Sequence, residues 1–265
     1  MPIAFALSGG GARAAAQVGV LRALLERGIR PDMVVGASAG AVNGAWLALD
    51  PDGLDDLESV WRGLTKRRVF PGTPAHYAYN LFRKGHVHPI DSWGRVLDLN
   101  FGSRVFEQAR FPLTVVTVRL SDGAVVAHDR GPISPALKAS TAVPGLFPPQ
   151  RIGDDLHVDG AVVEFLPIPT AMRLGATEIY AVDSSDFAYG DGVRGSTMDR
   201  SGQLAATAWV GLVVDRARTQ GLTVHRLRPP LGDIYDGRDF RHTVRLIADG
   251  YAYASAAVAG VQAAL

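Results

Sequence analysis

The sequence predicts an α/β fold built on a parallel sheet, and its first 50 residues carry most of the evidence. Short apolar runs at Ile3–Leu7 and Val34–Val35 stop at glycine-containing turns, as is typical of buried parallel strands. Each run precedes a segment with helical spacing, Ala12–Arg27 and Ala39–Leu49, and Gly28 stands at the C-cap position of the first. Strand, helix, strand, helix is the order of a βαβα unit, which implies a parallel sheet.

The remaining chain adds elements to this sheet. Residues 113–120 and 124–127 predict a hairpin around Ser121-Asp122-Gly123, and 134–141 predicts a short helix that ends before Pro144. Further elements are expected as strands at 156–158, 179–182 and 222–227, helices at 201–219 and 242–264, and a glycine-rich polar loop at 186–200. Because no internal repeat or interdomain linker is visible, we expect a single domain over residues 1–265.

Residues 50–110 differ in composition from their surroundings. A helical piece at 54–64 is followed by three consecutive basic residues at 66–68. An aromatic run then contains Phe70, His76, Tyr77, Tyr79 and Phe82. One interpretation is an insertion over the sheet edge that forms a lid or cap facing the substrate. A solvated basic face beside ordinary core aromatics explains the same pattern.

Composition restricts the functional class. The 27 basic and 26 acidic residues give a net charge of +1, which argues against a nucleic-acid partner. The absence of cysteine rules out disulfides, thiolate metal sites and a cysteine nucleophile. The N-terminus lacks a signal-peptide pattern, and the apolar stretch 33–49 is too short and too interrupted to span a membrane. We therefore expect a cytoplasmic protein, and transient contact with a membrane surface is compatible with this.

Gly36-Ala37-Ser38-Ala39-Gly40 is a GxSxG motif between a predicted strand and a predicted helix. This context is typical of a nucleophile elbow, in which a strained turn presents the serine at a helix N-terminus. Side chains at Gly36 and Gly40 would clash in such a turn. Ser38 is therefore the candidate nucleophile of an acyl hydrolase, and a tight structural turn is the alternative.

A glycine-rich loop, Gly9-Gly10-Gly11-Ala12-Arg13, lies between the first predicted strand and helix. Its amides could converge on an anion such as the tetrahedral oxyanion, and Arg13 could hold the loop. The same loop matches the G-x-G-x-x-A pattern of dinucleotide-binding proteins. That function needs an acidic residue after the second strand, where Gly36-Ala37-Ser38 stands instead.

Asp159, in Asp159-Gly160-Ala161, ends a predicted strand and is the candidate base. Burial would raise its pKa from about 3.9 and make it a better proton acceptor. An ordinary triad would use a histidine after an acid, and His225 or His242 would fit that order. His86-Val87-His88 has no nearby carboxylate cluster, so a metal site is not expected.

Together these motifs resemble the patatin-like phospholipase family. The matching text is Leu7–Arg13, Gln17–Leu21, Gly36–Ala41, Ala139–Pro149 and Val158–Ala161, in the family's order and spacing. The resemblance covers about residues 3–185 and leaves 186–265 outside the main motifs. It implies a three-layer α/β/α fold with a mainly parallel central sheet, and hydrolysis of lipid acyl esters without a metal or organic cofactor.

By position, the resemblance makes Ser38 the nucleophile and Asp159 the proton acceptor of a dyad without histidine. The oxyanion hole would come from Gly9, Gly10, Gly11 and Ala12, with Arg13, Gly36, Gly40, Gly160 and Ala161 in support. Ala14 and Ala161 stand where the family often has glycine, and Glu164-Phe165-Leu166-Pro167 replaces a common Asn-x-Pro. A non-catalytic lipid-binding protein that kept the fold is the main alternative.

Overall fold

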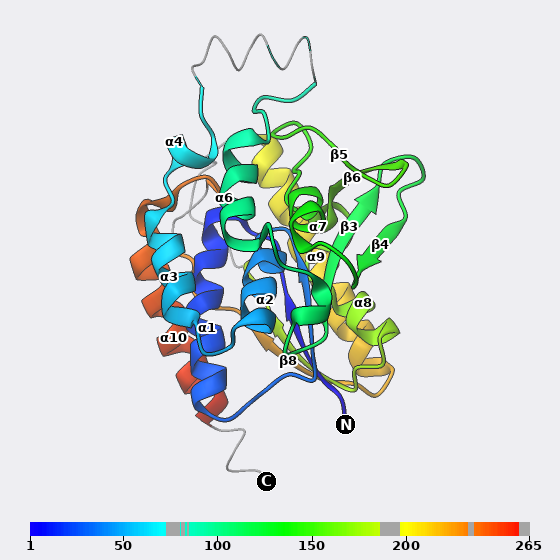
Figure 1. The fold of residues 1–265 in the computed structure, drawn as a ribbon. Coiled ribbons are helices and arrows are strands. Elements are labelled where there is room, and N and C mark those ends of the chain that lie inside the picture. The colour runs from blue at the N-terminus through cyan, green and yellow to red at the C-terminus, as the bar shows by residue number, and fades with distance from the viewer. Residues whose placement is uncertain (73–79, 81–82, 84, 186–196, 233–235, 260–265) are drawn as a thin grey trace.

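The computed structural model describes residues 1–72, 80, 83, 85–185, 197–232 and 236–259. Within these residues the protein is a three-layer α/β/α structure, in which a mainly parallel sheet lies between two layers of helices (Figure 1). The α/β prediction is therefore confirmed, and so is the layered fold that the family resemblance implies.

The strands of the described residues form one eight-stranded sheet in the order β5-β6-β3-β2-β1-β7-β8, with β4 paired to β3 off this path. The parallel part comprises β1, β2, β3, β7 and β8, whereas β4 and β6 run against β3, and β5 runs against β6. The bounds are β1 Ile3–Leu7, β2 Met33–Ala37, β3 Leu113–Arg119, β4 Val125–His128, β5 Gln150–Ile152, β6 Asp155–Asp159, β7 Glu178–Val182 and β8 Thr223–Leu227.

Helices cover both faces of the sheet, and the alternation of β1 shows why. Phe5 and Leu7 point into one apolar core, and Ala4 and Ala6 point into the other, as the period of two in a strand requires. The first core is built with α1 Ala15–Glu26, α2 Ala39–Leu49, α3 Leu54–Gly63, α4 Lys66–Val69, α6 Asp91–Phe101, α7 Ile133–Ser140 and α10 Thr243–Ala259. The second is covered by α8 Ile168–Arg173 and α9 Thr197–Thr219.

Strands β2 and β6 meet end to end along one edge of β3. Val116 of β3 pairs with Ala37, the last residue of β2, and Thr117 pairs with Asp159, the last residue of β6. Both Val116 and Thr117 pair with β4 on their other side, so β2 and β6 share the same edge. The residue that follows β2, Ser38, is thereby brought beside the end of β6.

Helix α1, which follows the glycine loop, packs closely against α10. A Cβ on Gly19 would lie 2.0 Å from the carbonyl oxygen of Ile247, and a Cβ on Gly250 would lie 2.2 Å from that of Ala16. Only glycine allows two helix backbones to approach this closely. The C-terminal helix therefore buttresses the element that positions the glycine loop.

Most predicted elements are present within one to three residues, although α9 begins four residues earlier than predicted and several short elements were not predicted. Helices α4, α6 and α8 and strand β5 were not predicted. The predicted loop 186–200 lies largely outside the described residues, but 197–200 belong to α9. Of the aromatic run, only Phe70 is described, where it stacks on Phe147 with ring centroids 5.4 Å apart. Most of the aromatic residues behind the lid prediction thus lie outside the described residues, and the structure does not test whether residues 50–110 form a lid.

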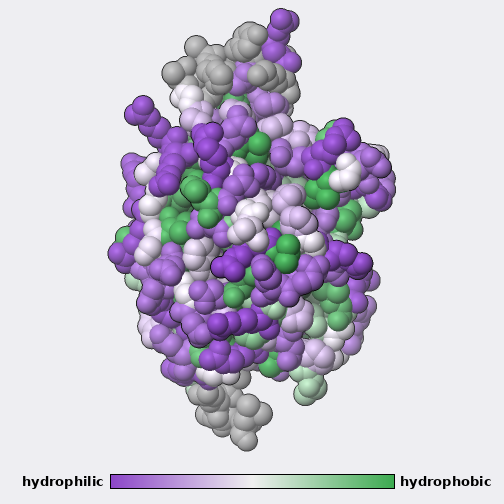
Figure 2. Space-filling model, in the orientation of Figure 1, coloured by the Kyte–Doolittle hydropathy of each residue, from purple (hydrophilic) through white to green (hydrophobic). Residues whose placement is uncertain are grey.

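In the described part of the chain, every helix is too short or too polar to cross a bilayer. On the face shown in Figure 2, hydrophobic residues form small separate areas between hydrophilic ones.

Candidate active site

Ser38 occupies a strained turn between β2 and α2. Its backbone angles are φ 56° and ψ −132°, and it is the only non-glycine residue with positive φ in the described chain. Such a conformation costs on the order of 1–3 kcal/mol and persists only where the surroundings impose it. It places the side chain at the N-terminus of α2, where the helix dipole favours negative charge.

The two glycines of the GxSxG motif are enforced by close packing. A Cβ on Gly36 would lie 2.5 Å from the Cα of Ala41. A Cβ on Gly40 would lie 2.4 Å from the carbonyl oxygens of both Leu7 and Ser8. These contacts press the start of α2 against the end of β1, and they leave no room for a side chain at either position.

Asp159 is within hydrogen-bond distance of the serine. Its Oδ2 accepts from Ser38 Oγ at 2.7 Å, and its Oδ1 accepts from the Ala161 amide at 2.8 Å. The residue is 2% exposed, and burial raises the pKa of its carboxyl from 3.8 to about 7, against the opposing effect of these two hydrogen bonds. A carboxylate with a pKa near 7 is suited to accept a proton at neutral pH.

Asp159 reaches the serine from a direction that the sequence did not predict. The sequence predicts that Asp159 ends a strand and that the sheet is mainly parallel, but β6, which Asp159 ends, is antiparallel to β3. Because β3 extends beyond β2, β6 can return along its edge and end at the level of Ser38. Gly160 makes the final turn possible, since a Cβ there would lie 2.2 Å from the carbonyl oxygen of Val116.

The glycine loop lies against both the nucleophile and the turn after Asp159. A Cβ on Gly9 would lie 2.9 Å from the Cβ of Ala161 and 3.3 Å from the Cβ of Ser38. The structure therefore brings together three segments that are far apart in the sequence: the loop after β1, the turn after β2 and the turn after β6.

The four amides predicted for the oxyanion hole are not equivalent. The Gly9 amide donates to the carbonyl oxygen of Phe165 at 2.9 Å, and the Ala12 amide donates to a carbonyl oxygen at 2.7 Å. The Gly10 and Gly11 amides have no hydrogen-bond acceptor among the described residues. Only these two can bind a ligand oxygen without giving up an existing bond.

Comparison with known proteins identifies the chain. A family model described as patatin-like phospholipase matches residues 5–172. The chain belongs to the patatin-like phospholipase family. An uncharacterized NTE family protein of Mycobacterium tuberculosis is 33% identical over 181 residues, which is 68% of this chain and 48% of that protein. The chain thus spans about half the length of this relative.

Two further proteins are similar to the chain, one in sequence and one in structure. The lysophospholipase nte1 of Aspergillus terreus is 29% identical over 280 residues, covering 95% of this chain and 18% of that protein. The crystal structure of VipD from Legionella pneumophila superimposes with a TM-score of 0.53 and 15% identity, over 97% of this chain and 66% of VipD. At that identity the likeness to VipD shows the patatin fold alone.

A buried polar network beneath the glycine loop was missed from the sequence. Gln17 of α1 donates to the Ser8 carbonyl oxygen at 2.8 Å and to Ser184 Oγ at 3.1 Å. Asn43 of α2 donates to Gln17 Oε1 at 3.0 Å, and Trp61 Nε1 donates to Asn43 Oδ1 at 2.8 Å. The available signal was a single polar residue, Asn43, in the otherwise small and apolar α2, and Gln17 in the apolar first half of α1.

Arg13 holds the glycine loop from within. Its side chain is 8% exposed, and its Nε donates to the Gly10 carbonyl oxygen at 3.1 Å. That bond turns the Gly10 carbonyl toward the guanidinium. Arg13 is therefore a buried residue in contact with the glycine loop.

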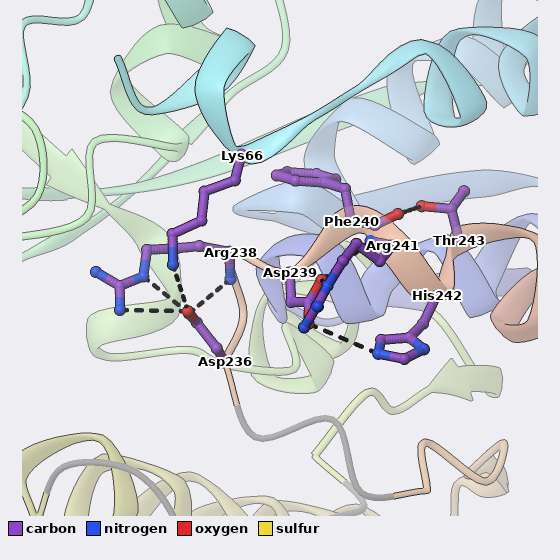
Figure 3. A network of polar contacts seen from close by, with 8 residues as sticks. All are labelled: Lys66, Asp236, Arg238, Asp239, Phe240, Arg241, His242 and Thr243. Atoms are coloured by element: carbon purple, nitrogen blue, oxygen red, sulfur yellow. Dashed lines mark hydrogen bonds and ion pairs between the residues drawn. The ribbon is translucent and has the colours of Figure 1, made fainter. Parts of the chain in front are cut away.

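The segment 236–242 covers the outer side of the glycine loop. The carbonyl oxygen of Gly237 accepts the Ala12 amide, and a Cβ on Gly11 would lie 2.3 Å from this oxygen. Figure 3 shows the ion pairs that hold the segment in place. Asp236 pairs with Lys66 of α4 at 2.9 Å and with Arg238 at 2.8 Å. These contacts link the 50–110 region to the loop.

The acidic residues of this segment are held ionised by neighbouring cations. Burial alone would raise the pKa of Asp236, but hydrogen bonds from Arg238 and Lys66 bring it down to about 2. The Arg241 guanidinium likewise lowers the pKa of Asp239 to about 2 (Figure 3). A groove runs between this segment and α4, and neither Ser38 nor Asp159 lines it.

Histidines occupy other places in the described chain. His225 Nε2 is 2.9 Å from Glu178 Oε1, and His242 Nε2 is 3.6 Å from Asp239 Oδ2. In the described residues no histidine hydrogen bonds with Ser38 or Asp159, so the alternative triad gains no geometric support. No group of three potential metal ligands occurs in that part of the chain either, His86 and His88 included.

Glu164, one of the departures from the family pattern, has a local role. Its carboxylate is 3% exposed and accepts from Thr170 Oγ1 at 2.7 Å and from Arg173 at 2.9 Å. Thr170 and Arg173 both belong to α8. Glu164 thus fastens the turn after Asp159 to the next helix.

Proposed function

We propose that this protein is a serine-type lipid acyl hydrolase that cleaves carboxylic esters of phospholipids, lysophospholipids or other acyl lipids. The observation that carries the proposal is the 2.7 Å hydrogen bond between Ser38 Oγ and the buried Asp159 carboxylate. The open Gly10 and Gly11 amides support it, as does membership of a phospholipase family that includes a named lysophospholipase.

In this proposal Ser38 and Asp159 form a dyad. Asp159 accepts the hydroxyl proton while Ser38 Oγ attacks the ester carbonyl carbon. The carbonyl oxygen becomes an oxyanion that the Gly10 and Gly11 amides bind, aided by the N-terminus of α2. Collapse breaks the bond to the alcohol, which leaves with the proton from Asp159. Water, deprotonated by Asp159, then attacks the carbonyl carbon of the acyl-enzyme. The bond from this carbon to Ser38 Oγ breaks, the proton returns from Asp159 to Ser38 Oγ, and the fatty acid is released.

The raised pKa of Asp159 suits both directions of this proton transfer. A carboxylate with a pKa near 4 would accept the serine proton poorly at neutral pH, because it is too weak a base. Burial brings the pKa to about 7, so the carboxylate accepts the proton and can return it to the leaving alcohol. Groups of the chain and water complete the reaction, so it needs no metal or organic cofactor.

The proposal also assigns roles to the domain as a whole and to the 50–110 region. The chain would act as one domain, on acyl lipids presented by a membrane or micelle surface. The 50–110 region would form a cap, since α4 within it is tied through Lys66 and Asp236 to the segment over the glycine loop.

The direct test measures hydrolysis of p-nitrophenyl esters and lysophospholipids by wild type, Ser38→Ala and Asp159→Asn. Each variant should lose activity by about a thousandfold or more, because the two residues act as a unit. Ser134→Ala is a matched control: this serine is also buried but donates to Asp98, away from the site.

A fluorophosphonate probe separates an enzyme from a lipid-binding protein of the same fold. Asp98→Asn, which changes a carboxylate away from the site, is the control. Labelling of wild type and of Asp98→Asn, but not of Ser38→Ala, supports Ser38 as the nucleophile. Undiminished hydrolysis by either dyad variant would contradict the dyad. Lipid binding without hydrolysis or labelling by wild type would favour the non-catalytic alternative.

A further inference from the structure

Ser140, the last residue of α7, carries a fully buried hydroxyl that the mechanism above does not use. Its exposure is 0%, and its Oγ makes two hydrogen bonds. It accepts the backbone amide of Ser38 at 2.9 Å and donates to the carbonyl oxygen of Val116 at 2.7 Å. Ser140 therefore bridges the nucleophile's own backbone to the middle of β3.

The Val116 carbonyl oxygen lies between the segment that carries Ser38 and the segment that carries Asp159. Val116 pairs with Ala37, the residue before Ser38, and Thr117 pairs with Asp159. The same oxygen abuts the turn after the base, since a Cβ on Gly160 would lie 2.2 Å from it. One backbone oxygen is thus in contact with the segment of Asp159 and, through Ser140, with the segment of Ser38.

We propose that Ser140 is a positioning residue for ester hydrolysis, which fixes the Ser38 turn against β3 and thereby sets the Ser38–Asp159 hydrogen bond. This inference rests on the proposed function. Ser140 touches neither the ester nor the reacting atoms; it acts through the backbone of Ser38.

The backbone of Ser38 explains why such a bond is needed. With φ at 56°, the turn is strained and relaxes unless neighbouring groups hold it. The Ser140 hydroxyl supplies an acceptor for the one backbone donor of Ser38. Relaxation would move Ser38 Oγ relative to Asp159, and a misplacement of about 1 Å can cost roughly a hundredfold in rate.

The same bond restricts the oxyanion hole. Because the Ser38 amide already donates to Ser140, it is not available to the oxyanion, and that task falls to the glycine-loop amides. The end of α7 is itself anchored, since Trp93 Nε1 donates to Thr141 Oγ1 at 2.8 Å. Ser140 is therefore held in place independently of Ser38.

The test compares Ser140→Ala with wild type and with Ser134→Ala, which removes another buried hydroxyl from the same helix. For each protein we would measure the melting temperature, kcat and KM for a p-nitrophenyl ester, and the rate of fluorophosphonate labelling. Ser140→Ala should lower kcat and the labelling rate by about ten- to a hundredfold while KM stays within twofold. Ser134→Ala should leave kcat within twofold of wild type.

Ser140→Cys is the second variant if Ser140→Ala does not melt cooperatively. A thiol accepts a hydrogen bond weakly, so kcat should fall several-fold at constant KM. A folded Ser140 variant with the kcat of wild type overturns the inference, and so does a loss carried by KM or one matched by Ser134→Ala. These outcomes require an active wild type. A wild type that neither hydrolyses esters nor reacts with the probe overturns the proposed function, and the inference with it.

Discussion

The polar groups on the two sides of the glycine loop are held in opposite ways. On the inner side, Gln17 and Asn43 are uncharged, fully buried and joined by a 3.0 Å hydrogen bond. On the outer side, Asp236 and Lys66 are charged, and their side chains are 37% and 58% exposed. Water can replace a lost partner on the outside but not on the inside, so the inner contacts should matter far more.

Two aspartates show the same contrast in their acidity. Asp159 receives a hydroxyl and an amide but no cation, and burial raises its pKa to about 7. Asp236 is also partly buried, yet Arg238 and Lys66 bring its pKa down to about 2. Burial thus raises the pKa of a carboxylate, and makes it a better base, only where no cation lies beside it.

The largest expected effect is on the pH dependence of the reaction. Because Asp159 must be ionised to accept a proton, kcat/KM of wild type should fall about tenfold per unit as the pH drops below 7. Initial rates of ester hydrolysis between pH 4.5 and 8 measure this limb. A rate that is flat down to pH 5 would show that Asp159 is not the group that accepts the proton.

Loss of Gln17 tests the inner side. Gln17→Ala removes the donor to Ser8 and one of the two acceptors of Asn43 Nδ2, so unfolding free energy should fall by about 3 kcal/mol. Urea denaturation measures it. Gln220→Ala, the same change at an exposed position, should stay within about 0.5 kcal/mol. Equal losses at the two sites would remove the basis of the comparison.

Asp159→Asn should stabilise the fold above neutral pH. The folded pKa of Asp159, about 7, lies above its ordinary 3.8, so ionisation costs stability as pH rises from 4 to 7. The variant should gain about 4 kcal/mol over wild type at pH 8, and that gain should disappear near pH 4.

Asp236→Asn should behave with the opposite sign. The folded pKa of Asp236, about 2, is lower than its ordinary 3.8, so its stabilising effect is present above pH 4 and lost as pH falls toward 2. Because the residue is partly exposed, its effect should be smaller than that of Asp159. Urea melts of both variants at pH 8 and 4 measure the change in unfolding free energy. Changes of the same sign in the two variants at pH 8 would refute the contrast between the two aspartates.

Trp61→Phe removes one donor from the edge of the inner network. The indole nitrogen donates to Asn43 Oδ1 at 2.8 Å, so its loss leaves that buried oxygen unpaired and should cost about 1–2 kcal/mol. Thermal melting measures the change. Trp46→Phe is the control, since its indole donates to the Gly53 carbonyl oxygen from a partly buried position, and it should cost less.

Lys66→Met should have the smallest effect. The Lys66–Asp236 pair is largely solvated, so its removal should change unfolding free energy by less than about 0.5 kcal/mol and leave ester hydrolysis unchanged. A rate loss of more than tenfold would mean that this pair, and not Ala12 alone, sets the position of the segment over the glycine loop.

The candidate site was largely predictable because its residues stand at strand ends, where sequence motifs are local. Ser38 and the glycine loop each fall within one βα turn. The antiparallel return of β6 was not predictable, since it depends on the pairing of Thr117 with Asp159, 42 residues later. Ser140 lies within the motif Ala139–Pro149, but its role was not predictable, because its partners, a backbone amide and a carbonyl oxygen, leave no signature in the sequence around it.

The order of the strands has a consequence for how the protein is made. β1, the middle strand of the parallel part, precedes the other strands in the sequence but pairs on one side with β7, about 175 residues later. Its edge toward β7 therefore stays unpaired until residues 178–182 have been synthesised, and contacts of such long range are slow to form. The serine and its base are themselves 121 residues apart. A nascent chain can thus form its serine–carboxylate pair only after β6, which ends at Asp159, has been synthesised.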